Sequence, residues 1–425
     1  VGRSNDPGKV RADSLAVEFS LGSLMRGEWR ATELTINGVA LDLGLNDKGQ
    51  VDGPLMFNFG SLSVDQLNLT GRAAFHDAAS RSAFELSDIA FSGEVRSSGS
   101  SVRGNGNFVL LGTRYPFQIS LAQAGSGDAR RVHVTIDPGA RAEFVDVDGV
   151  LSFDERSPRF DGALTLAGAG EPAGKNFSGD PSQRPWRVAA RVKADPKGAR
   201  LDRVEAGYGR VDSALRLTGG GEIHFGSSPR LHVALSAPQL DADRLLAGDR
   251  DPPARLLRSL QGSLTKIPKP WLAADIGISA DRIMLGGRPI QNFETVLHSD
   301  AASWTISRLA FQPPGATRVT VKGEILHAGS SPGLNGTLDV ESSDPDTFIA
   351  WLQGEREVTS RTRKPLHVQA ELAVDPGRVV FEQLKADTGG GSIEGRLAFV
   401  DLAAASGARA DVELKARRFD LDAAA

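Results

Sequence analysis

The stretch from Arg11 to Leu45 reads RADSLAVEFSLGSLMRGEWRATELTINGVALDLGL, and its apolar residues recur at every second position. The alternating apolar positions are Leu15, Val17, Phe19 and Leu21, then, after a break at residues 25–28, Leu34 and Ile36, and then, past Gly38, Val39, Leu41, Leu43 and Leu45. Successive side chains of a β-strand point to opposite faces, so each run has one apolar and one polar face. The runs are short and are separated by glycine-containing breaks, which predicts successive antiparallel strands.

The same alternation continues through most of the chain. It is clear at Phe117, Ile119 and Leu121, and again at Val132, Val134 and Ile136. One extra residue between Val64 and Leu67, and another between Leu86 and Ile89, shifts the alternation and predicts β-bulges. Asp148-Gly149 stands between two alternating runs and predicts a hairpin turn.

These patterns predict an all-β fold, in which an elongated, twisted and mostly antiparallel sheet curls into an open apolar groove. A sandwich or a closed barrel would instead bury the apolar face against itself. An exposed apolar face usually marks a binding surface, and a continuous one suits hydrocarbon chains. The residues predicted to line the groove are Leu15, Val17, Phe19, Leu21, Leu34, Ile36, Val39, Leu41, Leu43, Phe117, Ile119, Leu121, Val132, Val134 and Ile136.

The chain divides into three regions. Residues 1–170 form a first groove region, and residues 171–186, rich in Gly and Pro, form a linker or a long loop. Residues 187–425 form a second groove region built of repeats, with copies that start near Arg187, Leu272 and His367. The sequence begins with Val1 rather than Met and ends within the third copy, so we expect it to belong to a longer protein.

A few short helices are expected at the edge of the sheet, after residue 240. Asp241 or Asp243 can cap one of them. Asp344 can cap another that has Pro345 at its first position, where proline is favoured. In that second helix, Phe348, Ile349 and Leu352 form the predicted apolar stripe.

The composition argues against several kinds of chemistry. The chain has no Cys, and its seven His residues form no metal-ligand spacing. The glycine triplets at residues 219–221 and 389–391 do not lead into a helix with Lys and Ser or Thr, as a phosphate loop would, and they are interpreted as turns. A net charge of −4 gives no sign of a nucleic-acid partner. We therefore predict no enzymatic activity, no catalytic residues, no metal and no cofactor.

Two phrases of the sequence resemble the AsmA family. The first is LAVEFSLGSLMRGEWRATELTINGVALDLGLNDKGQ, with a corner at Ser23 to Gly27 and a hairpin turn at Asp47 to Gly49. The second is LSVDQLNLTGRAAFHDAASRSAFELSDIAFSGEV, which is similar to the hairpin that follows in that family. AsmA-like proteins are related to the bridge-like lipid-transfer proteins of the Gram-negative envelope. The resemblance implies a periplasmic protein that is anchored in the inner membrane by an N-terminal helix outside this chain.

Three functions of different classes follow from these observations. The first is a conduit that shields the acyl chains of phospholipid or another lipid in its groove and supports transfer between the inner and outer membranes. The second is a structural or assembly factor for outer-membrane proteins that acts on envelope protein partners, for example by strand addition at a sheet edge. The third, a carbohydrate-binding β-protein, fits least because such proteins favour exposed aromatic residues, and only five Trp and two Tyr are present.

Overall fold

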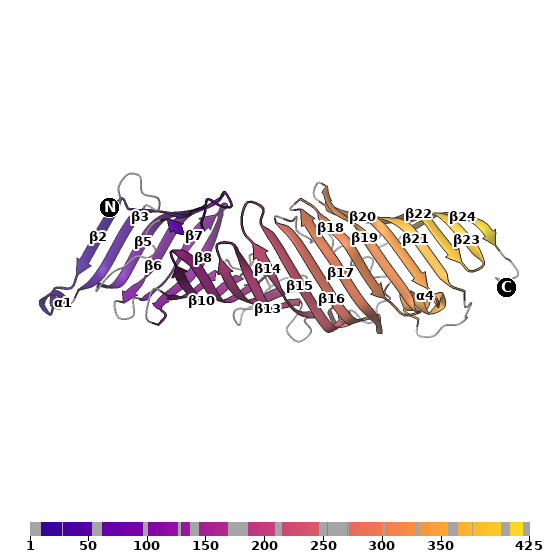
Figure 1. Ribbon diagram of the computed structural model, residues 1–425, viewed down its shortest axis with the longest axis horizontal. Helices are drawn as coiled ribbons and strands as arrows, with labels where there is room; N and C mark the ends of the chain where they lie inside the picture. Colours follow the sequence, from indigo (N-terminus) through magenta and orange to yellow (C-terminus); the bar gives the residue numbers. More distant parts are fainter. Residues whose placement is uncertain are drawn as a thin grey trace. The chain divides into compact units, whose positions relative to one another are not determined.

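A computed structural model of the chain is almost entirely β-structure (Figure 1). It describes residues 10–27, 29–52, 62–96, 101–125, 129–136, 144–168, 186–208, 215–245, 253, 270, 272–300, 302–328, 331–355, 364–375, 377–400 and 409–419. The described strands form one open, mostly antiparallel sheet of 24 strands. This confirms the all-β, antiparallel fold class that the alternation predicts.

The chain separates into two compact units. Unit 1 comprises Val1–Arg210 and Gly219–Pro229, and unit 2 comprises Val211–Thr218 and Arg230–Ala425. Most of the predicted linker, residues 171–185, lies outside the described residues.

Unit 1 contains the first thirteen strands and one short helix. These elements are β1 (Val10–Arg11), β2 (Ser14–Phe19), α1 (Leu21–Met25), β3 (Arg30–Leu45), β4 (Val51–Asp52), β5 (Ser63–Asp77), β6 (Ser82–Arg96), β7 (Ser101–Leu110), β8 (Thr113–Gln123), β9 (Arg130–Ile136), β10 (Phe144–Asp154), β11 (Ser157–Ala167), β12 (Trp186–Asp195) and β13 (Gly198–Tyr208). Strand β14 (Leu215–His224) contributes residues to both units.

Unit 2 contains the remaining strands and two described helices. These elements are β15 (Arg230–Asp241), α2 (Ala242–Leu245), β16 (Ala273–Leu285), β17 (Arg288–Asp300), β18 (Trp304–Gln312), β19 (Thr317–Ala328), β20 (Ser331–Ser342), α4 (Pro345–Gln353), β21 (Leu366–Asp375), β22 (Arg378–Thr388), β23 (Gly391–Val400) and β24 (Arg409–Phe419). Of these strands, β15 and β16 pair in parallel, and the others with described registers pair with their neighbours in antiparallel fashion.

The cross-strand registers place apolar residues opposite apolar residues. Leu34 lies opposite Leu67 between β3 and β5, and Ile119 lies opposite Val134 between β8 and β9. Residues directly opposite each other share one face, so the apolar face continues from strand to strand within the unit. One buried apolar cluster in unit 1 is Ala31, Leu34, Val64, Leu67 and Val95, and one in unit 2 is Ile306, Ile325, Leu334, Val374 and Val379.

Both predicted bulges are present. The pairing of β5 with β6 shifts register between Val64 and Leu67, and that of β6 with β7 shifts between Ser87 and Ala90. At the second bulge Asp88 has a φ of 48°. Each bulge absorbs the extra residue and returns the next apolar side chain to the same face.

Three local predictions at the start of the chain are wrong. Leu21 does not extend the first strand but begins helix α1, which lies far before residue 240. The runs on either side of Gly38 form one strand, β3, in which Gly38 (φ 65°) lies at a bulge in the pairing with β5, between Ile36 and Val39, rather than at a turn. Strand β3 then pairs with β5 in parallel rather than in antiparallel fashion, with Arg30 opposite Ser63 at one end and Leu45 opposite Asp77 at the other.

Two glycine predictions also fail, and the structure gives a physical reason for the failure at Gly149. Gly149 lies in the middle of β10 and not in a hairpin, and Gly219 to Gly221 lie within β14 and not in a turn. A Cβ at Gly149 would come within 2.6 Å of the Cα of Gly162 on β11. Because glycine has no Cβ, the two strands can approach each other here, and the ring of Phe160 can lie over them. The second triplet forms the predicted turn, between β22 and β23, at Gly389 and Gly390.

Helix α4 of unit 2 begins where the sequence predicts it. Asp344 caps α4 by accepting a hydrogen bond from the backbone N–H of Thr347, and Pro345 occupies the first turn. The predicted stripe is wrong, because Ile349 is exposed whereas Ala350 and Trp351 are buried. Trp351 donates its indole N–H to the carbonyl of Leu285, 3.0 Å away, which turns the tryptophan face of the helix to the sheet.

The hairpins that begin the first and third copies match in detail. The pairing of β12 with β13 shifts register between Ala189 and Arg191, and that of β21 with β22 shifts between the aligned residues Gln369 and Glu371. The aligned residues Arg203 and Gln383 both have a positive φ, of 51° and 48°. In the middle copy, Asn292 of β17 also has a positive φ, of 51°, but there the register shift lies between β17 and β18, from Gln291 to Glu294, and not within the hairpin of β16 and β17.

The glycine pair at Gly149 and Gly162 makes a stability prediction. In Gly162→Val, the new Cβ would lie 2.6 Å from both the Cα of Gly149 and the Cζ of Phe160. We expect a loss of about 1–3 kcal/mol in the free energy of unfolding, measured by urea denaturation. Gly44→Val is the control, because the nearest heavy atom to its Cβ position is 3.7 Å away. Equal losses in the two variants would contradict the close-approach explanation.

Candidate functional site

The predicted groove residues fall into three environments within unit 1. On β8 and β9, all six of them are half-buried: Phe117, Ile119, Leu121, Val132, Val134 and Ile136. On β3, Leu34 and Val39 are buried, whereas Ile36, Leu41 and Leu43 are half-buried. On β2, Leu15 is 63% exposed, and Val17 and Phe19 are also exposed. The apolar face is therefore neither a closed core nor a uniformly open surface.

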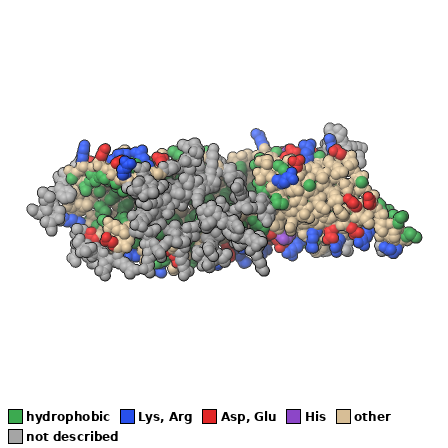
Figure 2. Space-filling view, turned by 180° about the vertical axis from the view of Figure 1, so that it is seen from behind, with side chains coloured by type: hydrophobic (Ala, Val, Ile, Leu, Met, Phe, Trp, Pro, Cys, Tyr) green, Lys and Arg blue, Asp and Glu red, His purple; other side chains and the backbone are tan. Residues whose placement is uncertain are grey.

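The cross-strand pairings bring most of these residues together. Leu15 and Val17 lie opposite Ile36 and Leu34, and Phe19 lies opposite Ala31. The apolar residues of β8 lie opposite those of β9 in the pairs Phe117–Ile136, Ile119–Val134 and Leu121–Val132. Leu21 does not join this face, because it lies on α1 and is 79% exposed. In unit 2, Figure 2 shows hydrophobic side chains gathered between charged side chains toward the C-terminal end of the chain.

Unit 1 also contains an apolar pocket of about 520 Å³ that the sequence did not predict. It forms where the ends of β3, β5 and β6 meet the hairpin of β10 and β11. Its largest side chains are Leu45, Phe75, Phe84, Leu151, Phe160 and Phe225. The sequence does show phenylalanines within a few residues of strand ends, which could have indicated a pocket. Alternation alone, however, does not say which strand ends lie together.

Turns that are distant in the sequence hold this pocket together. The backbone N–H of Val51 donates to the carbonyl of Arg156, with an N···O distance of 3.0 Å. The Arg156 guanidinium donates back to the carbonyl of Val51 through Nε (3.1 Å) and Nη2 (2.8 Å). Gln50 Nε2 donates to the carbonyl of Glu155, 3.1 Å away. We call the contact between residues 50–51 and 155–156 the clasp.

The opposite, polar face of the sheet carries histidine–carboxylate pairs. His133 contacts Asp146, and His298 contacts Asp275 at 2.6 Å. The hydrogen bond from His298 lowers the pKa of Asp275, and Arg230 adds to this effect. Burial opposes ionisation of Asp339, but hydrogen bonds from Gln369 and His367 bring its pKa below the ordinary value. These contacts stabilise the charged form of both carboxylates.

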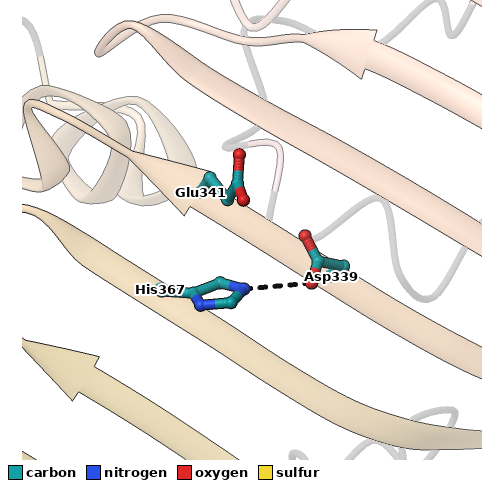
Figure 3. Close-up of side chains that lie close together, drawn as sticks. All are labelled: Asp339, Glu341 and His367. Carbon is teal, nitrogen blue, oxygen red and sulfur yellow. Dashed lines mark hydrogen bonds and ion pairs between the residues drawn. The ribbon is translucent and has the colours of Figure 1, made fainter.

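One of these groups, formed by Asp339, Glu341 and His367, has the residue types of a metal site. Figure 3 shows His367 turned toward Asp339 on the neighbouring strand, with Glu341 two residues further along that strand. Each side chain offers a ligand atom, and these atoms lie within 4.8 Å of one another. Oδ2 of Asp339 already contacts His367 Nε2 at 3.0 Å and Gln369 Nε2 at 2.9 Å. Hydrogen bonding accounts for this arrangement without a metal.

Unit 2 has a larger hollow, of about 1400 Å³, where β17, β19, β20, β21 and β22 begin or end. Its lining includes the charged residues Arg288, Arg318, Glu341 and Asp387. This mixed polar lining differs from the apolar pocket of unit 1. It offers no continuous apolar surface to a hydrocarbon chain.

The fold and the site define an all-β protein built on one mostly antiparallel sheet with an apolar and a polar face. No family model, no curated protein and no solved structure matches this chain. Within the described residues, no helix is long and apolar enough to cross a membrane.

The lowered pKa values of Asp275 and Asp339 predict acid sensitivity. A carboxyl with a lowered folded-state pKa contributes stability above its unfolded pKa of about 3.9, and loses it as the pH falls through the folded value. We expect the free energy of urea unfolding to fall between pH 5 and pH 2. The drop should be smaller in Asp275→Asn/Asp339→Asn than in the parent. A drop of the same size in both proteins would contradict the prediction.

Proposed function

We propose that this chain is a non-enzymatic, periplasmic protein of the cell envelope that shields lipid acyl chains on its apolar face. In this role it supports phospholipid transfer between the inner and outer membranes. The observation that carries the proposal is the half-buried row on β8 and β9, where Phe117, Ile119 and Leu121 lie beside Ile136, Val134 and Val132. Side chains of a closed core would be buried throughout, whereas these remain accessible.

Energetics favour a hydrocarbon ligand for such a face. Each CH₂ group removed from water contributes about 0.8 kcal/mol, so a long acyl chain gains much from lying along adjacent apolar strands. The sheet can supply this contact without a polar recognition site. A face of this kind would select a ligand by its hydrocarbon chain rather than by its headgroup.

The location and the partners belong to the same proposal. The resemblance of residues 15–50 and 62–95 to AsmA-like proteins supports a periplasmic location and an inner-membrane anchor outside this chain. Phospholipid, or another lipid with acyl chains, is the proposed ligand, and other envelope proteins are possible partners. No nucleic-acid partner is proposed, in keeping with the net charge of −4.

An assembly role for outer-membrane proteins is the second candidate, and the sheet edges favour it. Among the described strands, β2 pairs only with β3, and β24 pairs only with β23. An unpaired strand edge presents backbone N–H and C=O groups that can accept an added strand from a partner. This role would require the edges rather than the apolar face.

The two candidates differ in how they respond to a charge on the apolar face. Ile119 is half-buried on that face, and its neighbour Gln118 is exposed on the other face, opposite Thr135. We expect Ile119→Asp to stay folded but to lose most of its co-purified phospholipid, because a carboxylate interrupts the hydrocarbon path. Gln118→Asp is the matched control and should keep its lipid. Native mass spectrometry measures the bound lipid, and circular dichroism measures the fold.

Each other outcome of this experiment counts against the proposal. If Ile119→Asp unfolds, the face is a closed core, because an unpaired carboxylate buried there costs several kcal/mol. If it folds and carries as much lipid as the control, the face does not bind acyl chains. If no phospholipid accompanies the parent protein, the assembly role becomes the better interpretation.

A further inference from the structure

The apolar pocket of unit 1 differs from the rest of the apolar face because two walls enclose it. One wall is Leu45 with Phe75 and Phe84, whose rings lie 5.1 Å apart between centroids. The other wall is Leu151 with Phe160, which lie directly opposite each other on β10 and β11. Its volume of about 520 Å³ falls within the range of small-ligand pockets, roughly 300–1,000 Å³.

The lining chemistry indicates what kind of ligand fits. The two carboxylates at the rim are engaged by their own turns. Asp77 accepts hydrogen bonds from the backbone N–H of Ala79 and the hydroxyl of Ser80, and Asp195 accepts from the backbone of Lys197 and Gly198. The rest of the described lining is dominated by aromatic, aliphatic and proline side chains. Such a pocket suits a hydrocarbon segment without polar groups.

The exposure of the aromatic residues points to an occupant. Phe84 is 50% exposed and Phe225 is 43% exposed, although both line the pocket. Apolar rings that remain open to water at a concave site are a mark of a ligand-binding surface. A chain of CH₂ groups between the walls would cover them and would be shielded on two sides rather than one.

The clasp keeps the walls at this separation. It joins Val51, which follows β3 at one wall, to Arg156, which lies in the turn between β10 and β11 at the other wall. Beside it, a Cβ at Gly49 would lie 2.7 Å from the Cβ of Pro196, so a third turn closes on the same point. Strand pairing therefore builds each wall, and the contacts at Val51 and Gly49 join the two walls to each other.

We infer that this pocket is a distinct binding site that seats the methyl end of one acyl chain, while the lipid headgroup stays outside it. The inference rests on the proposed function, because it assigns one segment of the same apolar face to one part of the lipid. The rest of the face contacts acyl chains on one side only. The clasped pocket holds the chain end on two sides and therefore holds it more tightly.

Photocrosslinking tests this assignment. The probe is a palmitic acid analogue with a diazirine at its methyl end, and the crosslinked peptides are identified by mass spectrometry. We expect the main crosslinks on peptides that contain Phe75, Phe84 or Phe160. Ala194→Trp places a large side chain in the pocket from β12 and should reduce these crosslinks at least fivefold. Ala163→Trp, on an exposed position of β11, is the control and should leave them unchanged.

The possible outcomes separate this inference from the proposed function. Crosslinks on β8 and β9 but not at the pocket would overturn the pocket inference and leave the groove function standing. No specific crosslinks anywhere would count against both. Pocket crosslinks that persist in a folded Ala194→Trp protein would also overturn the inference, because the chain end would then lie elsewhere.

The clasp provides a second, independent variant. Arg156→Ala removes both guanidinium hydrogen bonds to the carbonyl of Val51 but leaves the pocket lining intact. We expect crosslinking at Phe84 and Phe160 to fall, with crosslinking on β8 and β9 retained. Arg159→Ala is the matched control, because this arginine on β11 pairs with the exposed Asp154. Equal crosslinking in the two variants would show that the clasp does not support the pocket.

Discussion

The register of cross-strand pairing is the constraint on which the rest of this structure depends. Residues directly opposite each other point to the same face, so the alternation in one strand fixes which face its neighbour must offer. A slip of one residue would move a whole apolar row, such as the one on β8, to the polar face. Where the sequence carries an extra residue, the bulges at Val64–Leu67 and Ser87–Ala90 absorb it, so the apolar side chains that follow stay on the apolar face. They allow one apolar face to persist even though the sequence alternation is not perfect.

Glycine pairs at mid-strand modify this sheet without changing its register. Gly93 lies opposite Gly104, and Gly149 lies opposite Gly162, and in each pair a phenylalanine ring covers the two Cα atoms. A pair without side chains lets the strands approach and bend, and the ring restores the lost contact area. Gly323 and Gly336 form a similar close pair in unit 2. These positions look like turn signals in the sequence, yet they act as places where the sheet can curve.

The sequence predicted what depends on neighbouring residues and missed what depends on distant ones. Alternation predicted the strands and the bulges, and Asp344 followed by Pro345 predicted the cap of α4, because each of these is decided within a few residues. It misplaced Gly149 because a glycine in a close approach and a glycine in a hairpin have the same local sequence. It missed the parallel pairing of β3 with β5, because alternation within a strand does not say which strands pair or in which direction. The pocket of unit 1 could not be predicted from the sequence for the same reason, since Phe84 and Phe160 are far apart in the chain and come together only in the folded sheet.

The turn between β10 and β11 shows how such a distant contact is built. Its two residues, Glu155 and Arg156, both have a positive φ, of 47° and 70°, as a two-residue turn of this type requires. Asn-Gly would adopt this shape at little cost, whereas other residues in the left-handed region cost roughly 1–3 kcal/mol each. The side chain of Arg156 offsets that cost by donating twice to the carbonyl of Val51. The residue identities in this turn are therefore explained by the hydrogen bonds of Arg156 to Val51 and not by the backbone preference of the turn. Because this contact lies outside the strand ladder, it joins the two walls of the pocket in addition to the strand pairing within each wall.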